Sequence, residues 1–434
     1  MTAEQFNEGL PKELMLFSLP PTQTGVEKMY FVDCRPVSQI SGSGPIEFHI
    51  SGQSSDYLDL RRSQLFVKTR ILKQDGSPLV ANESAAFVNI PLHSLWGQVD
   101  VSLQGKVLSG NSGNYAYKAY IQSLLNYGTS TKATQLSAQL YYQDTPGNMD
   151  ETDPDGNNSG LFSRNEFTKG SLSVDLIGPL AEDLCRLDRY ILNGVNVEIK
   201  LYRNRNAFVL MSGESNPNYQ IELQEVIFRA CRVQVNPGVL VGHNKALEIS
   251  PAKYPFVKTE IKTASVPTGQ TSFIWDNLYQ SKLPTKIVVG LVSADALTGS
   301  YDKNPFNFQP FNASTIGVYV NNVSVPSRPH KLDLTGSGQC YVTAYRSLYE
   351  IAGKADLDAN NGIDRDDWPE GYALVGFQIQ PQFGTEQYLS LSHQANVRLE
   401  INFDSSLKET VSCIVYSEFN DMFEIDQSRS VILS

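Results

Sequence analysis

The chain has 434 residues, more than one hydrophobic core usually serves, so its length predicts two domains of about 200 residues each. Hydrophobic residues make up 41% and charged residues 19%, a balance that excludes disorder on a large scale. The net charge of −11 opposes binding to a phosphate backbone, so we expect no direct, sequence-specific contact with nucleic acid.

The cysteines and the N-terminus indicate the cellular compartment in which the chain folds. Five cysteines lie far apart and form no Cys-x-x-Cys pair: Cys34, Cys185, Cys231, Cys340 and Cys413. We expect reduced, mostly buried thiols, which suits folding inside a cell. No cationic segment precedes an unbroken apolar stretch at the N-terminus, and nowhere do about 18 apolar residues run together. We therefore expect a soluble protein without a signal peptide or transmembrane segment.

Residue usage predicts an all-β class. The 21 Tyr and 20 Phe stand with Val, Ile and Thr in short runs between Gly, Pro, Asn and Ser clusters. Residues 1–28 read as an N-terminal arm, in which residues 11–17 can form a short helix that docks on a neighbouring subunit. A frayed terminus is the alternative.

From Met29 onward, apolar residues alternate with polar ones, the pattern of half-buried strands in an antiparallel sheet. In the first half, this pattern predicts strands at residues 46–50, 65–71, 99–103, 172–176, 195–201 and 219–235. Residues 115–127 have helical spacing instead, and Gly128 stands where a helix would end. Residues 144–158 are rich in Asp, Asn, Gly and Pro, which predicts an exposed loop.

A second series begins after a candidate linker at residues 239–251. Its strands are predicted at residues 257–261, 287–291, 316–320, 374–379, 397–403 and 411–416. A helix is predicted over residues 341–352, ended by Gly353, and an acidic loop follows at residues 354–370. The predicted domains are therefore residues 29–238 and 252–434.

The two series match in order and partly in letters, which indicates an internal duplication. Three pairs of segments correspond: residues 99–105 with 316–322, Ala119-Tyr120 with Ala344-Tyr345, and Asn196-Val197 with Asn396-Val397. Strand, turn, helix, acidic loop and strand recur in that order. Long connections between the strands fit a two-sheet jelly roll better than a meander. We predict two tandem jelly-roll β-sandwiches, a double jelly roll, each with a short inserted helix.

Motifs for catalysis are missing from the sequence. It contains no phosphate-binding G-x-x-x-x-G-K-[ST], no H-E-x-x-H and no G-x-S-x-G, and its five histidines have no metal-ligand spacing. We therefore expect no enzyme, no catalytic residue and no cofactor. A carbohydrate-binding or carbohydrate-cleaving β-sandwich is the alternative, because aromatic residues and acidic loops are plentiful.

One acidic segment comes close to a calcium-binding loop. Asp356, Asp358, Asn360 and Asp364 supply oxygen ligands at alternate positions near Gly362. However, the glycine falls one place late, and Asp367 stands where a bidentate Glu belongs. Solvated acidic loops are the simpler interpretation, so these four residues are a weak metal-site candidate.

Three groups of segments resemble a known family: residues 16–24, residues 44–52 with 57–60 and 65–68, and residues 93–103 with 114–120. They look like the hexon-type capsid proteins of Maverick/Polinton-like elements and adintovirus-like DNA viruses of animals. The resemblance is strongest over residues 16–144 and continues more weakly to the C-terminus. It implies a major capsid protein that forms homotrimeric, pseudo-hexameric capsomers of an icosahedral virion, with neighbouring capsomers, penton and minor capsid proteins as partners. The duplication suits this role, because a trimer then presents six similar sandwiches.

Overall fold

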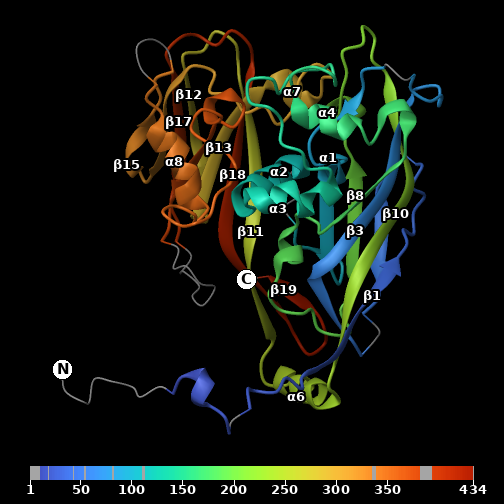
Figure 1. Cartoon of the computed structure of the whole chain (residues 1–434). Helices are drawn as coiled ribbons and strands as arrows, with labels where there is room; N and C mark the ends of the chain where they lie inside the picture. Colours follow the sequence, from blue (N-terminus) through green and yellow to red (C-terminus); the bar gives the residue numbers. More distant parts are fainter. Residues whose placement is uncertain are drawn as a thin grey trace.

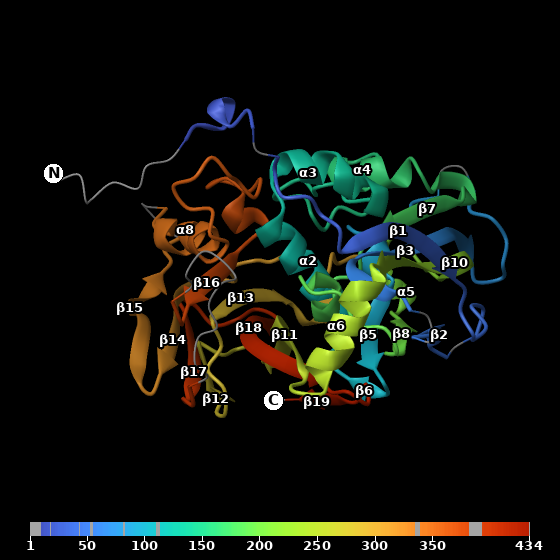
Figure 2. The same cartoon turned by 90° about the horizontal axis from the view of Figure 1, so that it is seen from below.

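The computed structural model describes residues 10–433 except 18, 43, 53–54, 81–82, 110–112, 335–338 and 382–392. Two β-sandwiches follow one another along the chain and stand side by side (Figure 1). Seen from below, each consists of two facing layers of strands (Figure 2). No helix in the described ranges is both long and apolar enough to cross a bilayer.

The first sandwich has two four-stranded antiparallel sheets, in the orders β1-β10-β3-β7 and β2-β8-β5-β6. Their bounds are β1 Val26–Cys34, β2 Ile46–Ile50, β3 Tyr57–Lys73, β5 Trp96–Leu103, β6 Lys106–Val107, β7 Val174–Gly178, β8 Val197–Arg203 and β10 Tyr219–Val235. A small extra sheet pairs β4 Ala86–Phe87 with β9 Leu210–Met211.

The second sandwich repeats this plan in the orders β11-β18-β13-β16 and β12-β17-β14-β15, with β19 added beside β18. The bounds are β11 Ala252–Val266, β12 Ser272–Tyr279, β13 Lys286–Ser293, β14 Ala313–Val320, β15 Val323–Lys331, β16 Leu374–Gln378, β17 Val397–Phe403, β18 Val411–Ile425 and β19 Val431–Leu433.

The two halves have the same strand order. If the strands of the paired sheets are numbered one to eight along each half, leaving out β4, β9 and β19, both sandwiches read 1-8-3-6 in one sheet and 2-7-4-5 in the other. This is the order of a jelly roll, in which two sheets close over one core. The predicted duplication is therefore confirmed, and its matched segments fall on equivalent elements: β5 with β14, α2 with α8, and the start of β8 with that of β17.

The duplicated turn after β5 and β14 also keeps its geometry. Gln104 and Gly105 have φ values of 49° and 75°, and Asn321 and Asn322 have values of 49° and 68°, as a tight hairpin turn requires. In both halves, the asparagine before the seventh strand holds this turn. The Asn196 carbonyl accepts a hydrogen bond from Gln104 N at 3.0 Å, and the Asn396 carbonyl accepts one from Asn321 N at 2.9 Å.

Each sandwich carries a longer helix between its fifth and sixth strands, as predicted: α2 Tyr115–Asn126 and α8 Val342–Ile351. Gly353 follows α8 with φ of 65°, the left-handed conformation that ends many helices. Gly128 does not play this role, and that prediction is wrong. It has extended backbone and begins the next helix, because Tyr127 already leaves the helical conformation.

Shorter helices lie in the connections: α1 Pro91–Ser94, α3 Thr129–Ala133, α4 Ser159–Asn165, α5 Asn206–Val209, α6 Pro237–Leu247 and α7 Ala294–Thr298. Single 3-10 turns are formed by Lys12–Leu14, Gln135–Gln139, Lys169–Ser171, Asp183–Arg186 and Trp368–Glu370. Helix α6 occupies most of the predicted linker. Asn236 caps it by accepting a hydrogen bond from Gly238 N at 2.8 Å, and Pro237 starts it.

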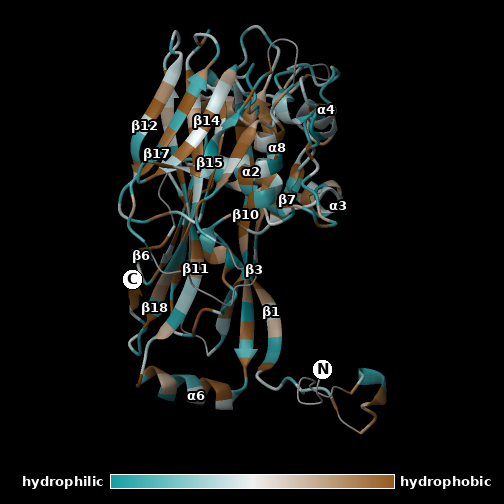
Figure 3. Ribbon diagram, turned by 90° about the vertical axis from the view of Figure 1, so that its left-hand side faces the viewer, coloured by the Kyte–Doolittle hydropathy of each residue, from teal (hydrophilic) through white to brown (hydrophobic). Residues whose placement is uncertain are grey.

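The N-terminal arm differs from its prediction. Residues 11–17 contain one 3-10 turn, Lys12–Leu14, rather than a longer helix, since a helix this short needs packing to persist. Strand β1 begins at Val26, inside the predicted arm. The arm leads from the base of β1 away from the sandwiches (Figures 1 and 3). Its described apolar residues are exposed: Leu10, Leu14, Met15, Leu16, Phe17 and Leu19.

Alternating side chains fill the cores. Apolar and polar bands follow one another along the strands (Figure 3), and β8 shows this period-two burial over Val197, Ile199 and Leu201. Phe48 of one sheet meets Phe228 of the facing sheet, with 6.2 Å between ring centroids. Burying each such side chain contributes about 1.5–3 kcal/mol.

We predict that the equivalent substitutions Asn196→Ala and Asn396→Ala each lower the free energy of unfolding by about 1 kcal/mol. Asn196 Oδ1 accepts a hydrogen bond from Gly52 N at 2.9 Å, and Asn396 Nδ2 donates to Asn277 at 2.9 Å. Urea unfolding measures the loss, and the exposed Asn126→Ala is the control with little effect. Losses no larger than the control's would show that the side-chain hydrogen bonds to Gly52 and Asn277 do not contribute to stability.

Candidate functional site: the junction between the sandwiches

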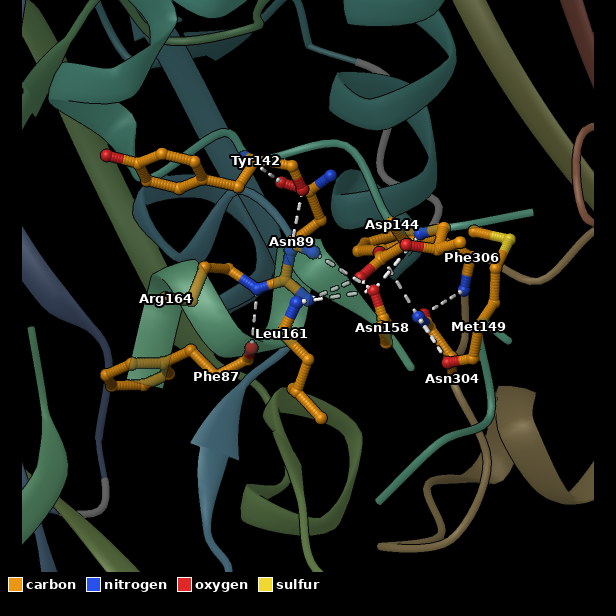
Figure 4. A network of polar contacts seen from close by, with 12 residues as sticks. Phe87, Asn89, Tyr142, Asp144, Met149, Asn158, Leu161, Arg164, Asn304 and Phe306 are labelled. Atoms are coloured by element: carbon orange, nitrogen blue, oxygen red, sulfur yellow. Dashed lines mark hydrogen bonds and ion pairs between the residues drawn. The ribbon is translucent and has the colours of Figure 1, made fainter. Parts of the chain in front are cut away.

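A charged pair lies fully buried where the sandwiches meet. The Arg164 guanidinium, on α4, donates to Asp144 Oδ1 at 2.6 Å, and neither side chain is exposed (Figure 4). Arg164 also donates to the carbonyls of Phe87 at 2.8 Å and Tyr142 at 2.7 Å. These bonds compensate for the loss of solvent, which would otherwise make a buried ion pair unfavourable.

Asp144 connects this pair to the second sandwich. Its Oδ1 also accepts from Asn158 Nδ2 at 3.0 Å, and its Oδ2 accepts from Asn304 Nδ2 at 3.3 Å. Asn304 precedes β14, so it belongs to the other half. The Tyr372 hydroxyl, also from the second half, donates to the Asp144 carbonyl at 2.7 Å. Four polar groups from three connections thus converge on one residue, and Figure 4 shows those of Arg164, Asn158 and Asn304.

The predicted exposed loop at residues 144–158 is therefore wrong at both ends. Asp144 and Asn158 are fully buried, although the residues between them include exposed ones. Asn158 caps α4 by accepting hydrogen bonds from Gly160 N and Leu161 N, so its side chain serves the helix and the junction together. Composition alone indicates a loop, and only the partners Arg164 and Asn304 explain the burial.

Aromatic rings surround the polar contacts. Tyr120 of α2 stacks on Phe306 of the second half, with centroids 4.2 Å apart and planes inclined by 9°. Tyr117, one turn earlier, meets Phe208, Phe306 and Phe308 edge to face. Such pairs contribute about 0.5–1.5 kcal/mol each beyond the area they bury. Helix α2 is thus packed between both sandwiches.

A second buried ionic group also involves α2. Lys118 Nζ lies 2.9 Å from Glu182 Oε2 and 3.0 Å from Asp183 Oδ1, and all three side chains are almost fully buried. Asp183 Oδ2 accepts from the backbone N of Thr259, on β11, at 2.9 Å. Burial raises the pKa of Glu182 above its usual range, against the opposing effect of Lys118.

The acidic connection of the second half closes over α3. Thr129 N and Oγ1 donate to Asn360 Oδ1 at 3.1 and 2.5 Å, and Lys132 Nζ donates to the Asn361 carbonyl at 2.5 Å. Burial, with a smaller effect from Lys354, lowers the pKa of Lys132 to about 7. The junction therefore includes an amine that titrates near neutral pH.

The calcium candidates lie in this connection, with protein groups as partners. Asp356 accepts from Arg346 at 2.7 Å, Asn360 from Thr129, and Asp364 from the backbone N of Asp366 and Asp367 at 2.9 and 2.8 Å. Across the described ranges, no three His, Cys, Asp or Glu side chains gather as metal ligands. The calcium loop, Asp358 included, stays a prediction.

A cavity of about 520 Å³ lies beside α2, next to Cys185. Arg61 and Arg186 are among its lining residues, together with the buried Gln122, Gln139 and His93. Burial lowers the pKa of His93 to about 4, and this ring contacts the Tyr115 hydroxyl at 2.9 Å and Gln139 at 3.0 Å. All five cysteines are free thiols: three are buried, Cys34 is half-buried and Cys340 is exposed.

Sequence comparison finds a relative of similar length. No protein-family model matches the chain. An uncharacterized protein of Caenorhabditis elegans, F54H12.2, is 26% identical over 430 residues, covering 96% of this chain and 99% of that protein.

Asp144→Ala should lower the free energy of unfolding by about 3–5 kcal/mol, because it leaves the Arg164 charge buried without its partner. The matched control is Asp188→Ala, which breaks the exposed Arg61–Asp188 pair and should cost no more than about 1 kcal/mol. Chemical denaturation measures both. Equal losses in the two variants would contradict the role of the buried pair.

The lowered pKa of Lys132 predicts a pH dependence. Charging this amine in the folded protein is unfavourable, so the penalty is fully present below about pH 7 and is relieved as the pH rises toward the unfolded value of 10.5. The free energy of unfolding, measured relative to Lys132→Met, should rise between pH 7 and 9 by on the order of 1 kcal/mol per pH unit. A difference that stays constant over this range would contradict the assignment.

Solved structures with a similar fold come from viruses. A chain of the Sputnik virophage aligns with a TM-score of 0.68 at 13% identity, covering 99% of this chain and 93% of that one. The Faustovirus major capsid protein gives 0.56 at 10% identity, covering 98% and 93%. The mavirus major capsid protein gives 0.55 at 10% identity, covering 100% and 97%. At these identities the likeness is one of fold, and the chain has the double jelly-roll fold of viral major capsid proteins.

Proposed function

We propose that the chain is a major capsid protein, a structural subunit that forms homotrimeric, pseudo-hexameric capsomers of an icosahedral shell. The observation that carries the proposal is the duplicated jelly roll, with one strand order in both halves. Three copies of a chain with two like sandwiches present six similar units around one axis, so a closed threefold assembly fills a hexagonal lattice site. The fold shared with viral capsid proteins supports the same role.

The junction suits a building block of this kind. A subunit that packs against copies of itself needs its two sandwiches at a fixed angle, and buried, directional contacts across the junction, such as Asp144 with Asn304, provide this rigidity. The exposed arm carries apolar side chains that a neighbouring subunit, capsomer or minor capsid protein can cover. Penton proteins are further partners under this proposal.

We further propose a Maverick/Polinton-like or adintovirus-like origin, with folding and assembly inside the host cell and a final location in the virion. The resembling segments at residues 16–144 support it, and so does a full-length relative from a nematode. The carbohydrate alternative rested on the many aromatic residues and the acidic loops; among the aromatics, Trp96 and Trp368 are fully buried and Trp275 is half-buried, so two of the three tryptophans cannot stack on a sugar.

The test is the assembly state of the purified full chain. We expect light scattering to give the mass of three chains, and negative-stain electron microscopy to show hexagonal particles that form larger tiles as salt is varied. A chain that stays monomeric at high concentration, without larger assemblies at any salt concentration, would count decisively against the proposal.

The arm offers a sharper variant. Leu16→Asp combined with Phe17→Asp places charges on two exposed apolar positions outside the sandwiches, so the subunit should fold and form three-chain particles. Larger tiles should be lost if the arm joins neighbouring capsomers. The matched control is Val241→Asp on α6, also exposed and apolar but outside the arm. Tiles that survive the arm variant would remove this role for the arm.

A further inference from the structure

The ionic group on α2 contains one amine and two carboxyl groups in a dry environment. Lys118, Glu182 and Asp183 have side chains that are 5%, 3% and 1% exposed. The nearby Cys185 thiol is buried as well, and burial raises its pKa to about 12. A charged group in such surroundings is costly unless its charge is fully balanced.

The balance of charge here is incomplete. One ammonium faces two carboxylates, which leaves an excess negative charge if both carboxyls ionise. Burial acts to lower the pKa of Lys118, but Asp183 and Glu182 outweigh it and raise this pKa. The pKa of Glu182 is raised by burial, so this carboxyl is suited to hold or accept a proton. An acid, an amine and a proton carrier therefore meet at hydrogen-bond distance.

Asp183 is also oriented for attack. Its Oδ2 accepts the backbone N–H of Thr259 at 2.9 Å, while Oδ1 faces Lys118 Nζ at 3.0 Å. A backbone N–H on one carboxyl oxygen stabilises the negative charge that develops there when a nucleophile adds to the carbon. The second sandwich thus supplies the donor, and the first supplies the amine and both carboxyls.

We propose that Lys118 and Asp183 condense into an amide, an intramolecular cross-link formed without any other protein. Fixing both groups in contact makes this bond accessible, because effective concentrations of well-oriented groups reach about 10⁵ M or more. In dilute aqueous solution, by contrast, amines and carboxylic acids remain separate ammonium and carboxylate ions.

The step balances in atoms and charge. Lys118 Nζ passes a proton to Glu182, and its electron pair attacks Cγ of Asp183. A second proton leaves nitrogen by the same route as the C–Oδ1 bond breaks, and Glu182 delivers both protons to the departing oxygen. One ammonium and one carboxylate become one amide and one water, and Glu182 returns to its initial state. No oxidant, reductant or cofactor takes part.

The product satisfies the site better than the ion pair does. The amide is neutral, so the charges of Lys118 and Asp183 disappear, and Glu182 can then take up the proton that its raised pKa favours. Its carbonyl oxygen keeps the hydrogen bond from Thr259 N, and its N–H can donate to Glu182. The cross-link ties α2 to the Asp183–Arg186 turn at the place where both lie against β11. We expect it to reinforce the junction against heat and force.

Intact-mass spectrometry of the denatured full chain tests the proposal. We expect folded wild-type protein to be lighter than its sequence by one water in nearly all chains. Proteolysis should then yield a branched peptide that joins the segments around Lys118 and Asp183 and survives reducing agents. A wild-type mass equal to the sequence mass, after prolonged incubation of folded protein, would overturn the proposal.

Variants separate the roles. Lys118→Arg keeps the positive charge but should abolish the mass loss, and Glu182→Gln should abolish or greatly slow it by removing the proton carrier. Lys132→Arg is the matched control, because Lys132 is also a buried lysine but bonds to carbonyl groups, so this variant should lose one water like the wild type. If Lys118→Arg fails to fold, Glu182→Gln still decides. Undiminished mass loss in Glu182→Gln would overturn the role given to that residue.

Discussion

The placement of the two sandwiches depends on the carboxylate of Asp144. Apolar contacts such as Tyr120 on Phe306 favour association, but they tolerate sliding and rotation. A buried carboxylate does not, because each lost bond leaves a charge without solvent or partner. Asp144 binds Arg164 within the first half and Asn304 from the second, so both halves must keep their positions for one charge to stay satisfied.

This constraint explains why a duplicated protein has unlike connections. The strand orders are identical, yet α2 has eleven of twelve residues buried, while α8 buries one stripe that includes Ala344, Leu348 and Ile351. Helix α2 lies between the sandwiches and needs apolar or paired residues all round. Helix α8 lies on the outside of the second sandwich and keeps an open face with Tyr345 and Tyr349 half-exposed. One chain needs a single internal junction, so only one helix of the pair was adapted to it.

The sequence predicts a strand well where one face of the strand is buried and the other is exposed to solvent. The predictions for β10 and β17 agree to the residue, because period-two alternation is a property of the strand itself. Strands β12 and β15 are missed. Turn residues flank β12 on both sides. Pro326 and Pro329 interrupt the pattern of β15, and prolines are tolerated there because β15 lies at the edge of its sheet. The junction is not predictable in this way, since Asp144, Lys118 and Arg164 are polar residues whose burial depends on partners far away in the chain. The sequence indicates such a junction only through the duplication, which predicts two sandwiches in one chain.

The same reasoning bears on how copies of the chain could meet. Within one chain, the first sandwich uses α2 and its acidic connections against the second, and these groups are no longer available to a neighbour. A neighbouring copy must therefore meet different surfaces: the outer faces of the sheets, the open side of α8 and the exposed arm. Contacts between chains are then chemically distinct from the contact within a chain, even though all six sandwiches of the proposed trimer share one fold. A covalent duplication permits separate surfaces for the two kinds of contact, because the internal junction forms once during folding and the outer surfaces remain available for assembly.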